Sequence, residues 1–192
     1  MPAYTTICCS FGKTDRDGLV RRFYTTVFAD DVAFKNVFPW ACDPELTLDE
    51  ITNWNQSKLN SDFVLGYDEH VQNDYRQLVL TSHPFSECRL ILHNLESEIS
   101  FHFIVPEDEI NSGNSHCLEN TCRRIWLKLP ATAIESYGEI ESPTGTQAIE
   151  SGQPPSTRLF ALIDYDCTNT EYAPNSNIER MDRGYFLKPN DA

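Results

Sequence analysis

The amino-acid sequence predicts an α+β fold: a mostly antiparallel sheet of about six to seven strands, with two main helices packed on one face. Two helical patterns, at about 14–29 and 47–59, lie near the start of the chain, and short strand patterns fill most of the rest. Helices and strands do not alternate strictly, as they would around a parallel sheet. With 192 residues, 40% of them hydrophobic, we expect a single domain, 1–192, around one core.

The chain begins with a strand pattern over residues 3–11, a stretch rich in β-branched and small residues. The helix at 14–29 follows it, and Thr14 or Asp15 can cap the first turn. Its apolar residues recur at the spacing of one buried helical stripe: Leu19, Val20, Phe23, Tyr24, Val27 and Phe28. We therefore expect this helix to pack against the sheet.

A capping-box pattern marks the start of the second helix. In Thr47-Leu-Asp-Glu50, the threonine and the glutamate can each accept a hydrogen bond from the other residue's backbone N–H. The helix would continue to about Leu59, with Leu48 and Ile51 on its apolar side.

A hairpin is the clearest strand signal. Over 98–105, four apolar residues alternate with four others, as in a strand with one buried face. The short connection Asn94-Leu-Glu-Ser97 joins this strand to another at 88–93. The stretch 88–105 therefore predicts an antiparallel pair.

The remaining elements have weaker patterns. Further strands are predicted at 62–67, 75–81, 123–129, 157–166 and 183–188. A short helix is predicted at 132–140. Loop-like segments are predicted at 107–121 and 141–156, the second of which is rich in Pro and Gly.

Charge is the dominant compositional feature. The chain has 15 Lys and Arg against 29 Asp and Glu, a formal net charge of −14. Such a charge repels phosphates, so we expect no direct nucleic-acid binding and no attachment to an anionic membrane. Its sign suits a basic partner protein. The alternative is that the charge serves only solubility.

Targeting signals are absent from the sequence pattern. The stretch Met1-Pro2-Ala3-Tyr4 has no basic region of a signal peptide, and no apolar run approaches the roughly 18 residues of a membrane helix. The seven cysteines are an odd number, most simply explained as reduced thiols. We therefore expect a cytoplasmic protein.

Motifs for phosphate and zinc binding are incomplete. Gly12-Lys13-Thr14 resembles the end of a phosphate-binding loop, but Ile7 stands where that loop needs its first glycine. Cys117 and Cys122 have no second Cys/His pair of matching spacing, which a structural zinc site needs. We therefore predict no metal and no cofactor.

A carboxylate or histidine site is the enzymatic alternative. Asp164 and Asp166 lie two residues apart on a predicted strand, so their carboxylates share a face and could hold a hard cation together with a third ligand. His102 lies with Glu98 and Ser100 on the polar face of its strand, where we expect it to be exposed. No motif of a nucleophilic enzyme surrounds either group.

Most of the negative charge falls in two segments. Residues 41–73 contain seven acids and one base, and residues 86–121 again contain seven acids and one base. Carboxylates on such a surface speed the encounter with a basic protein and form paired contacts with it. The predicted partner-binding residues are Asp43, Glu45, Asp49, Glu50, Asp68, Glu69, Glu107, Asp108 and Glu109.

The sequence thus predicts a non-catalytic acidic binding protein of the inhibitor or immunity type, which covers a basic surface of a partner protein such as a nuclease toxin. A structural or regulatory subunit of an intracellular complex is one alternative. A small enzyme that uses Asp164, Asp166 or His102 is the other. If the two acidic segments share a face, the charge is an interface; if they lie on opposite sides, it is a solubilising coat.

Overall fold

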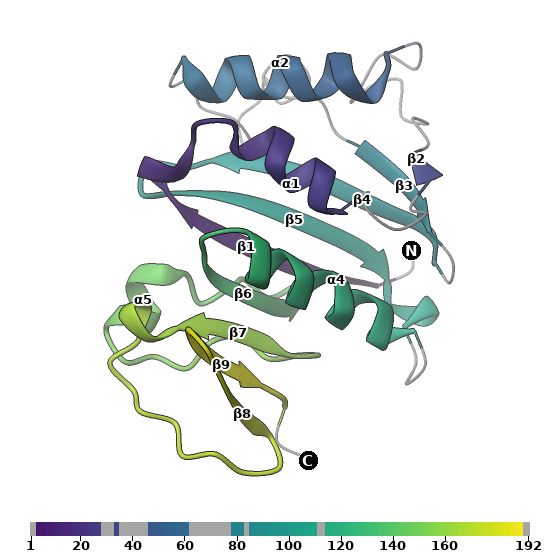
Figure 1. Cartoon of the computed structure of the whole chain (residues 1–192). Helices are drawn as coiled ribbons and strands as arrows, with labels where there is room; N and C mark the ends of the chain where they lie inside the picture. The colour runs from purple at the N-terminus through teal and green to yellow at the C-terminus, as the bar shows by residue number, and fades with distance from the viewer. Residues whose placement is uncertain are drawn as a thin grey trace.

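The computed structural model describes residues 3–27, 33–34, 46–61, 78–82, 85–110 and 114–189. These residues form one antiparallel sheet whose nine strands run in the order β2-β3-β4-β5-β1-β6-β7-β9-β8 (Figure 1). The strands are β1 (Tyr4–Gly12), β2 (Ala33–Phe34), β3 (Leu78–Ser82), β4 (Phe85–Asn94), β5 (Glu98–Pro106), β6 (Ala131–Gly138), β7 (Ala161–Asp164), β8 (Ile178–Met181) and β9 (Gly184–Leu187). The predicted α+β fold is confirmed.

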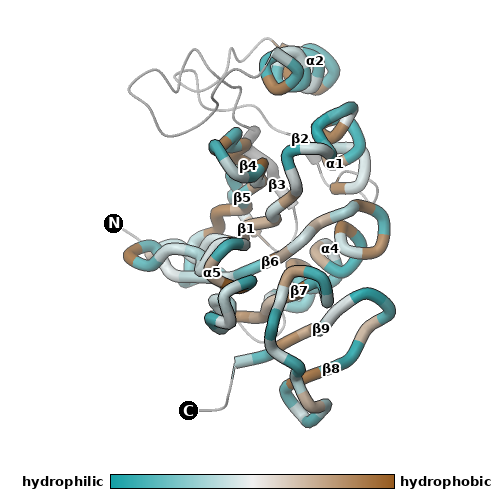
Figure 2. The backbone as a smooth tube through the Cα atoms, turned by 90° about the vertical axis from the view of Figure 1, so that its left-hand side faces the viewer, coloured by the Kyte–Doolittle hydropathy of each residue, from teal (hydrophilic) through white to brown (hydrophobic). Residues whose placement is uncertain are grey.

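Helices cover the sheet unequally. Figure 2 shows α1, α2 and α4 on one side of the sheet and the short helix α5 on the other. The helices are α1 (Leu19–Val27), α2 (Leu48–Asn60), α4 (Ser115–Lys128) and α5 (Thr146–Glu150), with 3-10 turns η1 (Lys13–Asp15), η2 (Glu107–Glu109) and η3 (Tyr165–Cys167). We call α1, α2 and α4 the helix layer, and the sheet side away from them the far face.

Aromatic packing fills the space between the sheet and the helix layer. Phe23 of α1 stacks on Phe101 of β5 with ring centroids 3.9 Å apart, and Phe11 of β1 meets both rings edge-on. All three side chains are fully buried. The apolar stripe predicted for the first helix is therefore the part of α1 that builds the main core.

A smaller apolar cluster lies on the far face beneath α5. Ile149 of α5 packs there against side chains from β6, β7 and β9. The buried members of the cluster are Ala133, Ile149, Ala161, Ile163, Tyr185 and Leu187. This cluster anchors α5 and the connection around it to the sheet.

Two predictions around residue 120 are wrong. The loop expected at 107–121 and the strand expected at 123–129 are both largely replaced by α4, preceded by η2. The buried residues of α4 recur at helical spacing: Leu118, Cys122, Ile125 and Trp126. Polar residues among them interrupt the apolar pattern and gave the first half of the helix the composition of a loop.

The helix expected at 132–140 is also wrong, because these residues form strand β6. This strand lies between β1 and β7, with side chains buried on both of its faces. A strand buried on both sides loses the alternation that identifies strands in a sequence. The segment 141–156 is a loop as predicted, interrupted by α5.

The first helix begins later than expected, since residues 13–15 form η1 and α1 starts at Leu19, while residues 28–29 lie outside the described residues. The other elements agree with the sequence to within a few residues. The capping box is present, since the Glu50 carboxylate accepts the Thr47 N–H at 2.8 Å and the Thr47 hydroxyl accepts the Glu50 N–H at 3.3 Å. The 88–105 hairpin is β4 and β5, while the strand expected at 62–67 lies outside the described residues. Among the described helices, none combines the length and apolar character needed to cross a membrane.

Candidate functional site

The acidic residues predicted to bind a partner lie in separate places. Four of them, Asp43, Glu45, Asp68 and Glu69, lie outside the described residues. Asp49 and Glu50 begin α2, and Glu107, Asp108 and Glu109 form η2 at the end of β5.

Four of the five described acids already bind groups of the same chain. Asp108 is exposed, whereas the carboxylates of the other four are partly neutralised or hydrogen-bonded by groups of the same chain. These contacts are Asp49 with Arg21 (3.7 Å), Glu50 with the Thr47 N–H (2.8 Å), Glu107 with Arg158, and Glu109 with the Ser86 N–H (2.8 Å).

The acids of segment 86–121 do not form one patch. Glu98 and Glu107 lie at opposite ends of β5, about 30 Å apart at the usual rise of a strand. Glu119 belongs to α4 and pairs there with Arg123 at 2.9 Å. The segment therefore distributes its negative charge over both sides of the sheet.

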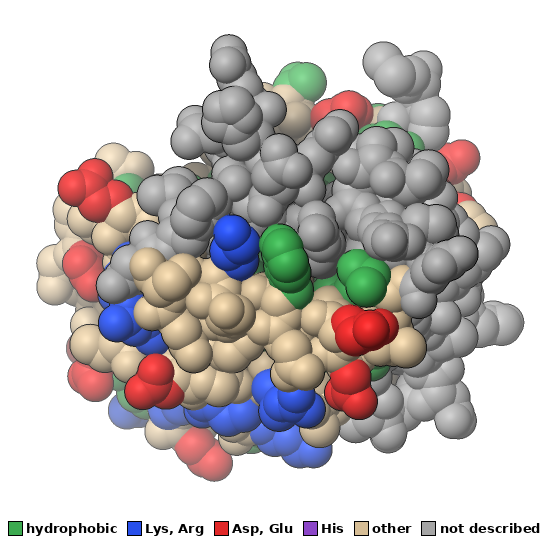
Figure 3. All heavy atoms as spheres, turned by 90° about the horizontal axis from the view of Figure 1, so that it is seen from above, with side chains coloured by type: hydrophobic (Ala, Val, Ile, Leu, Met, Phe, Trp, Pro, Cys, Tyr) green, Lys and Arg blue, Asp and Glu red, His purple; other side chains and the backbone are tan. Residues whose placement is uncertain are grey.

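The helix layer carries more bases than acids. Its three helices contain six Lys and Arg against three Asp and Glu. Figure 3, which views the α2 end of the molecule from above, shows Lys and Arg side chains beside Asp and Glu on that face. Because the whole chain has a net charge of −14, the excess of carboxylates lies elsewhere than on these helices.

Carboxylates gather instead where α5 meets the start of β5. We call Glu98, Glu150, Asp164 and Asp166, together with Cys167, the α5 corner. A cavity of about 270 Å³ opens here, with Glu98 from β5 and Glu150 from α5 in its wall. Its described lining residues are Phe11, Gly12, Ser97, Glu98, Thr132, Thr146, Gln147, Glu150 and Cys167, and they include no Lys or Arg.

The thiol of Cys167 reports the electrostatics of this corner. Burial, followed by the negative charges of Asp164, Glu150 and Asp166, raises the pKa of Cys167 to about 11. A protonated thiol is a poor nucleophile. The corner therefore disfavours the thiolate form of Cys167, although Arg183 partly offsets the carboxylates.

Hydrogen bonds fix the wall of the cavity. Thr146, the first residue of α5, donates its hydroxyl proton to Glu98 at 2.7 Å, and the Ser10 hydroxyl donates to the same carboxylate at 3.4 Å. Asp164 pairs with Arg183 at 2.9 Å, while Asp166 is exposed. The carboxylate of Glu98 is therefore held in place before any ligand arrives.

The candidate residues of the enzymatic alternative, His102 on one hand and Asp164 and Asp166 on the other, lie apart in the sheet. The sheet order places β1 and β6 between His102 on β5 and Asp164 on β7, which separates the two by at least about 14 Å at the usual strand spacing. Asp166 lies in η3 and not on β7, so the expectation that it shares a strand face with Asp164 is wrong. No group of three His, Cys, Asp or Glu in the described parts of the chain could hold a metal ion.

His102 is buried, and the expectation that it is exposed is wrong. The reason is that polar residues, rather than solvent, surround its strand on the far face. Its Nε2 lies 2.8 Å from the Ser100 hydroxyl and 3.6 Å from the Cys8 thiol, and its Nδ1 lies 3.1 Å from the Tyr137 hydroxyl. The ring of His93 lies beside it, with centroids 4.4 Å apart.

The protonation states of this network do not favour catalysis. Burial lowers the pKa of His102 to about 3 and that of His93 to about 4, and burial raises the pKa of the Cys8 thiol far above its usual value. At neutral pH the imidazoles and the thiol are all uncharged. The arrangement satisfies buried polar groups and does not form an activated thiolate–imidazolium pair.

Sequence reasoning missed Glu98 and Glu150 as members of one site. Glu98 was recognised only as part of a polar strand face, and Glu150 ends a helix inside a segment expected to be a loop. The available signal was the run of carboxylates at Glu150, Asp164 and Asp166, with only Arg158 to balance it. No family model, curated protein or solved structure matches the chain.

Proposed function

We propose that this chain is a non-catalytic acidic binding protein of the inhibitor or immunity type, which covers a basic surface of a partner protein such as a nuclease toxin. The observation that carries the proposal is the cavity of the α5 corner. Carboxylates from β5 and α5 line it, and its described walls include no cation. A lysine or arginine side chain of a partner fits that chemistry.

Electrostatic attraction would act both at long range, before the two proteins meet, and at direct contact. The net charge of −14 attracts a basic protein through solvent and raises its association rate. At contact, Glu98 and Glu150 would pair with a cationic side chain, while Cys167 supplies less polar surface for its methylene groups. Binding next to the partner's active cleft would then cover it without any catalytic step.

Capture of a binding protein from an extract of the cells that naturally make this chain tests the proposal. The wild-type chain on beads should retain a protein of basic isoelectric point at low salt and release it at high salt, because exposed charge pairs are screened. The corner variant, Glu98→Gln with Glu150→Gln and Asp166→Asn, should retain little of that protein.

A matched variant distinguishes the effect of the α5 corner itself from the effect of the net charge. Asp17→Asn with Asp49→Asn and Asp108→Asn also removes three negative charges, from exposed positions outside the corner. Because the sequence alone predicts Asp49 and Asp108 as partner-binding residues, this variant also tests that prediction against the corner. It should retain the partner. Equal loss in both variants, or capture of an acidic protein that salt does not release, would instead favour a structural or regulatory subunit whose charge serves only solubility.

A further inference from the structure

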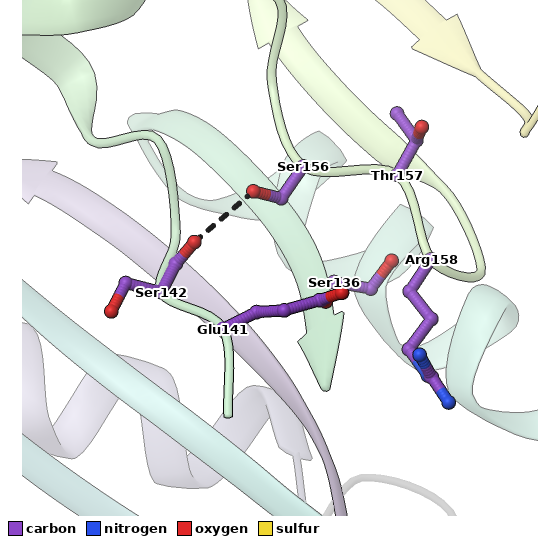
Figure 4. Close-up of a pocket in the computed structure, with 6 residues that line it drawn as sticks. All are labelled: Ser136, Glu141, Ser142, Ser156, Thr157 and Arg158. Carbon is purple, nitrogen blue, oxygen red and sulfur yellow. Dashed lines mark hydrogen bonds between the residues drawn. The ribbon is translucent and has the colours of Figure 1, made fainter. Parts of the chain in front are cut away.

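A second hollow lies at the end of β6, and it shares no residue with the α5 corner. Its volume is about 440 Å³, within the range of small-ligand sites. Figure 4 shows the side chains that line it. They are Ser136 of β6, Glu141 and Ser142 of the following loop, and Ser156, Thr157 and Arg158 of the segment before β7.

A buried carboxylate holds both walls of this hollow. Glu135 is only 1% exposed, and its carboxylate accepts backbone N–H groups from Thr144 (3.0 Å) and Gly145 (3.2 Å) on one wall and from Ser156 (2.8 Å) on the other. Within the described residues it has no ion-pair partner. Burying a carboxylate in this way is costly. The three hydrogen bonds offset part of this cost, and they fix the two loops relative to β6.

The neighbouring residue of β6 fixes the same segment from its other side. The Ser136 hydroxyl donates to the Phe160 carbonyl at 2.7 Å and accepts the N–H groups of Leu159 at 2.8 Å and Phe160 at 3.0 Å. The chain that carries Thr157 and Arg158 is therefore tied to two consecutive residues of a central strand. Such a hollow is rigid before a ligand binds, which lowers the entropic cost of binding.

Opposite charges face each other across the hollow without pairing. A methyl group on Gly138 would lie 3.2 Å from Arg158 Nη1 and 3.4 Å from Glu141 Oε2, so both groups reach the same point of the backbone. The Glu141 carboxylate accepts the Gly138 N–H at 2.7 Å, and Arg158 pairs through Nη2 with Glu107. No ion pair joins Glu141 to Arg158 among the contacts of the described residues.

We propose that this hollow binds a small zwitterionic ligand of the α-amino acid class. The ligand's ammonium group would bind the Glu141 carboxylate, and its carboxylate would bind Arg158 Nη1. Ser142 and Thr157 would offer hydroxyl groups to the rest of the ligand. A simple anion would meet the charges of Glu141 and Glu107, and a simple cation would meet Arg158. A zwitterion avoids both repulsions, and since it is neutral overall the net charge of −14 does not repel it.

Titration of the ¹⁵N-labelled protein with each of the twenty common L-amino acids tests the assignment. At least one should produce saturable shifts of the backbone amide signals of Ser142, Thr157 and Arg158. The amide of that amino acid lacks the carboxylate, and its N-acetyl derivative lacks the ammonium group. Each should bind about tenfold more weakly or worse, because each loses one charge-assisted contact.

Substitutions then locate the site. Glu141→Gln and Arg158→Gln should each weaken binding about tenfold or more. Glu139→Gln, at an exposed position two residues from Glu141, should leave the affinity unchanged. Glu107→Gln removes the ion pair of Arg158 but keeps its guanidinium, so affinity should stay within about twofold of wild type.

Three results would overturn the proposal. The first is that none of the twenty amino acids gives saturable shifts at these amides. The second is that a derivative lacking one charge binds as tightly as its parent, which would make the hollow a site for a simple cation or anion. The third is that Glu139→Gln or Glu107→Gln weakens binding as much as Glu141→Gln. None of these results bears on partner capture by the α5 corner.

Discussion

The two faces of the sheet are both well buried, but by different means. Against the helix layer the sheet presents large apolar side chains, such as Phe11 and Phe101. On the far face it buries polar groups, among them Ser10, His102 and Glu135. Hydrophobic burial therefore dominates against the helix layer, whereas the far face combines satisfied hydrogen bonds with the smaller apolar cluster beneath α5. The chemistry available for binding lies on the second, where α5 and its loops are held by polar contacts.

Buried polar atoms without a hydrogen-bond partner also differ between the helix-layer side and the far face. In the described parts of the chain, two buried side-chain polar atoms lack a hydrogen-bond partner, Thr5 Oγ1 and Trp126 Nε1. Thr5 lies two residues before Ile7, on the face of β1 that points toward the helix layer, and Trp126 belongs to α4. Neither of the two atoms belongs to the far face, where the buried polar side chains of the described residues all have partners.

The largest effect should come from the apolar face. Phe101→Ala should lower the free energy of unfolding by about 3–5 kcal/mol, because it removes a fully buried ring that stacks on Phe23. Ser100→Ala, at the adjacent position facing the other side, should cost only about 1 kcal/mol. Urea unfolding followed by fluorescence measures both. Similar losses at the two positions would break the comparison.

On the far face, the largest loss should follow removal of the Glu135 carboxylate. Glu135→Ala leaves three backbone N–H groups without their acceptor and should cost about 3 kcal/mol. Amide exchange of Thr144, Gly145 and Ser156 should speed up, whereas exposed Glu139→Ala should leave exchange and stability unchanged. Unchanged protection in Glu135→Ala would show that these bonds do not hold the loops.

Acidification should weaken the far face selectively. Folding lowers the pKa of His93 from 6.5 to about 4 and that of His102 to about 3, so the unfolded chain binds protons on these groups more tightly. The stability that they contribute is fully present above pH 6.5 and is lost as the pH falls toward 4. Between pH 7 and pH 5, each should account for a loss of about 2 kcal/mol.

The pH effect is measured by urea unfolding at both pH values. His102→Gln should reduce the loss between pH 7 and pH 5 by about 2 kcal/mol, and His116→Gln, at an exposed position on α4, should not. An equal pH dependence in wild type and His102→Gln would show that the imidazole titrates normally in the folded protein.

The smallest effect should come from the exposed start of α2. Thr47→Ala removes the hydroxyl that accepts the Glu50 N–H and should cost about 1 kcal/mol. Thr47→Ser keeps that acceptor and should remain within about 0.5 kcal/mol of wild type. Thermal unfolding followed by circular dichroism distinguishes the two. A larger loss than that of Glu135→Ala would contradict the expected order of these effects.

The sequence predicted elements whose signals are local. The capping box at Thr47, the apolar stripe around Phe23 and the hairpin that contains Phe101 all follow from neighbouring residues. Strand β6 and helix α4 were missed because their patterns depend on tertiary surroundings: β6 is buried on both faces, and α4 mixes polar residues with its stripe. His102 was misplaced for the same reason, since a polar strand face is exposed only where nothing covers it.

The candidate sites depend on contacts distant in sequence. Glu98 and Glu150 meet at one cavity although 51 residues separate them in the chain. The same holds for Glu135, which holds loops 9 to 21 residues away. The sequence supplied the sign of the charge, but the place where carboxylates converge came only from the strand order and the position of α5.

The association rate constant with the captured partner, measured by stopped flow at low and high ionic strength, tests the central claim most directly. For the wild-type chain and the variant with Asp17, Asp49 and Asp108 neutralised, we expect a rate constant that falls steeply with salt and a similar dissociation rate constant. For the variant with Glu98, Glu150 and Asp166 neutralised, we expect dissociation to be at least about tenfold faster. Equal dissociation rate constants in all three proteins, or association that does not depend on salt, would contradict an acidic binding site at the α5 corner.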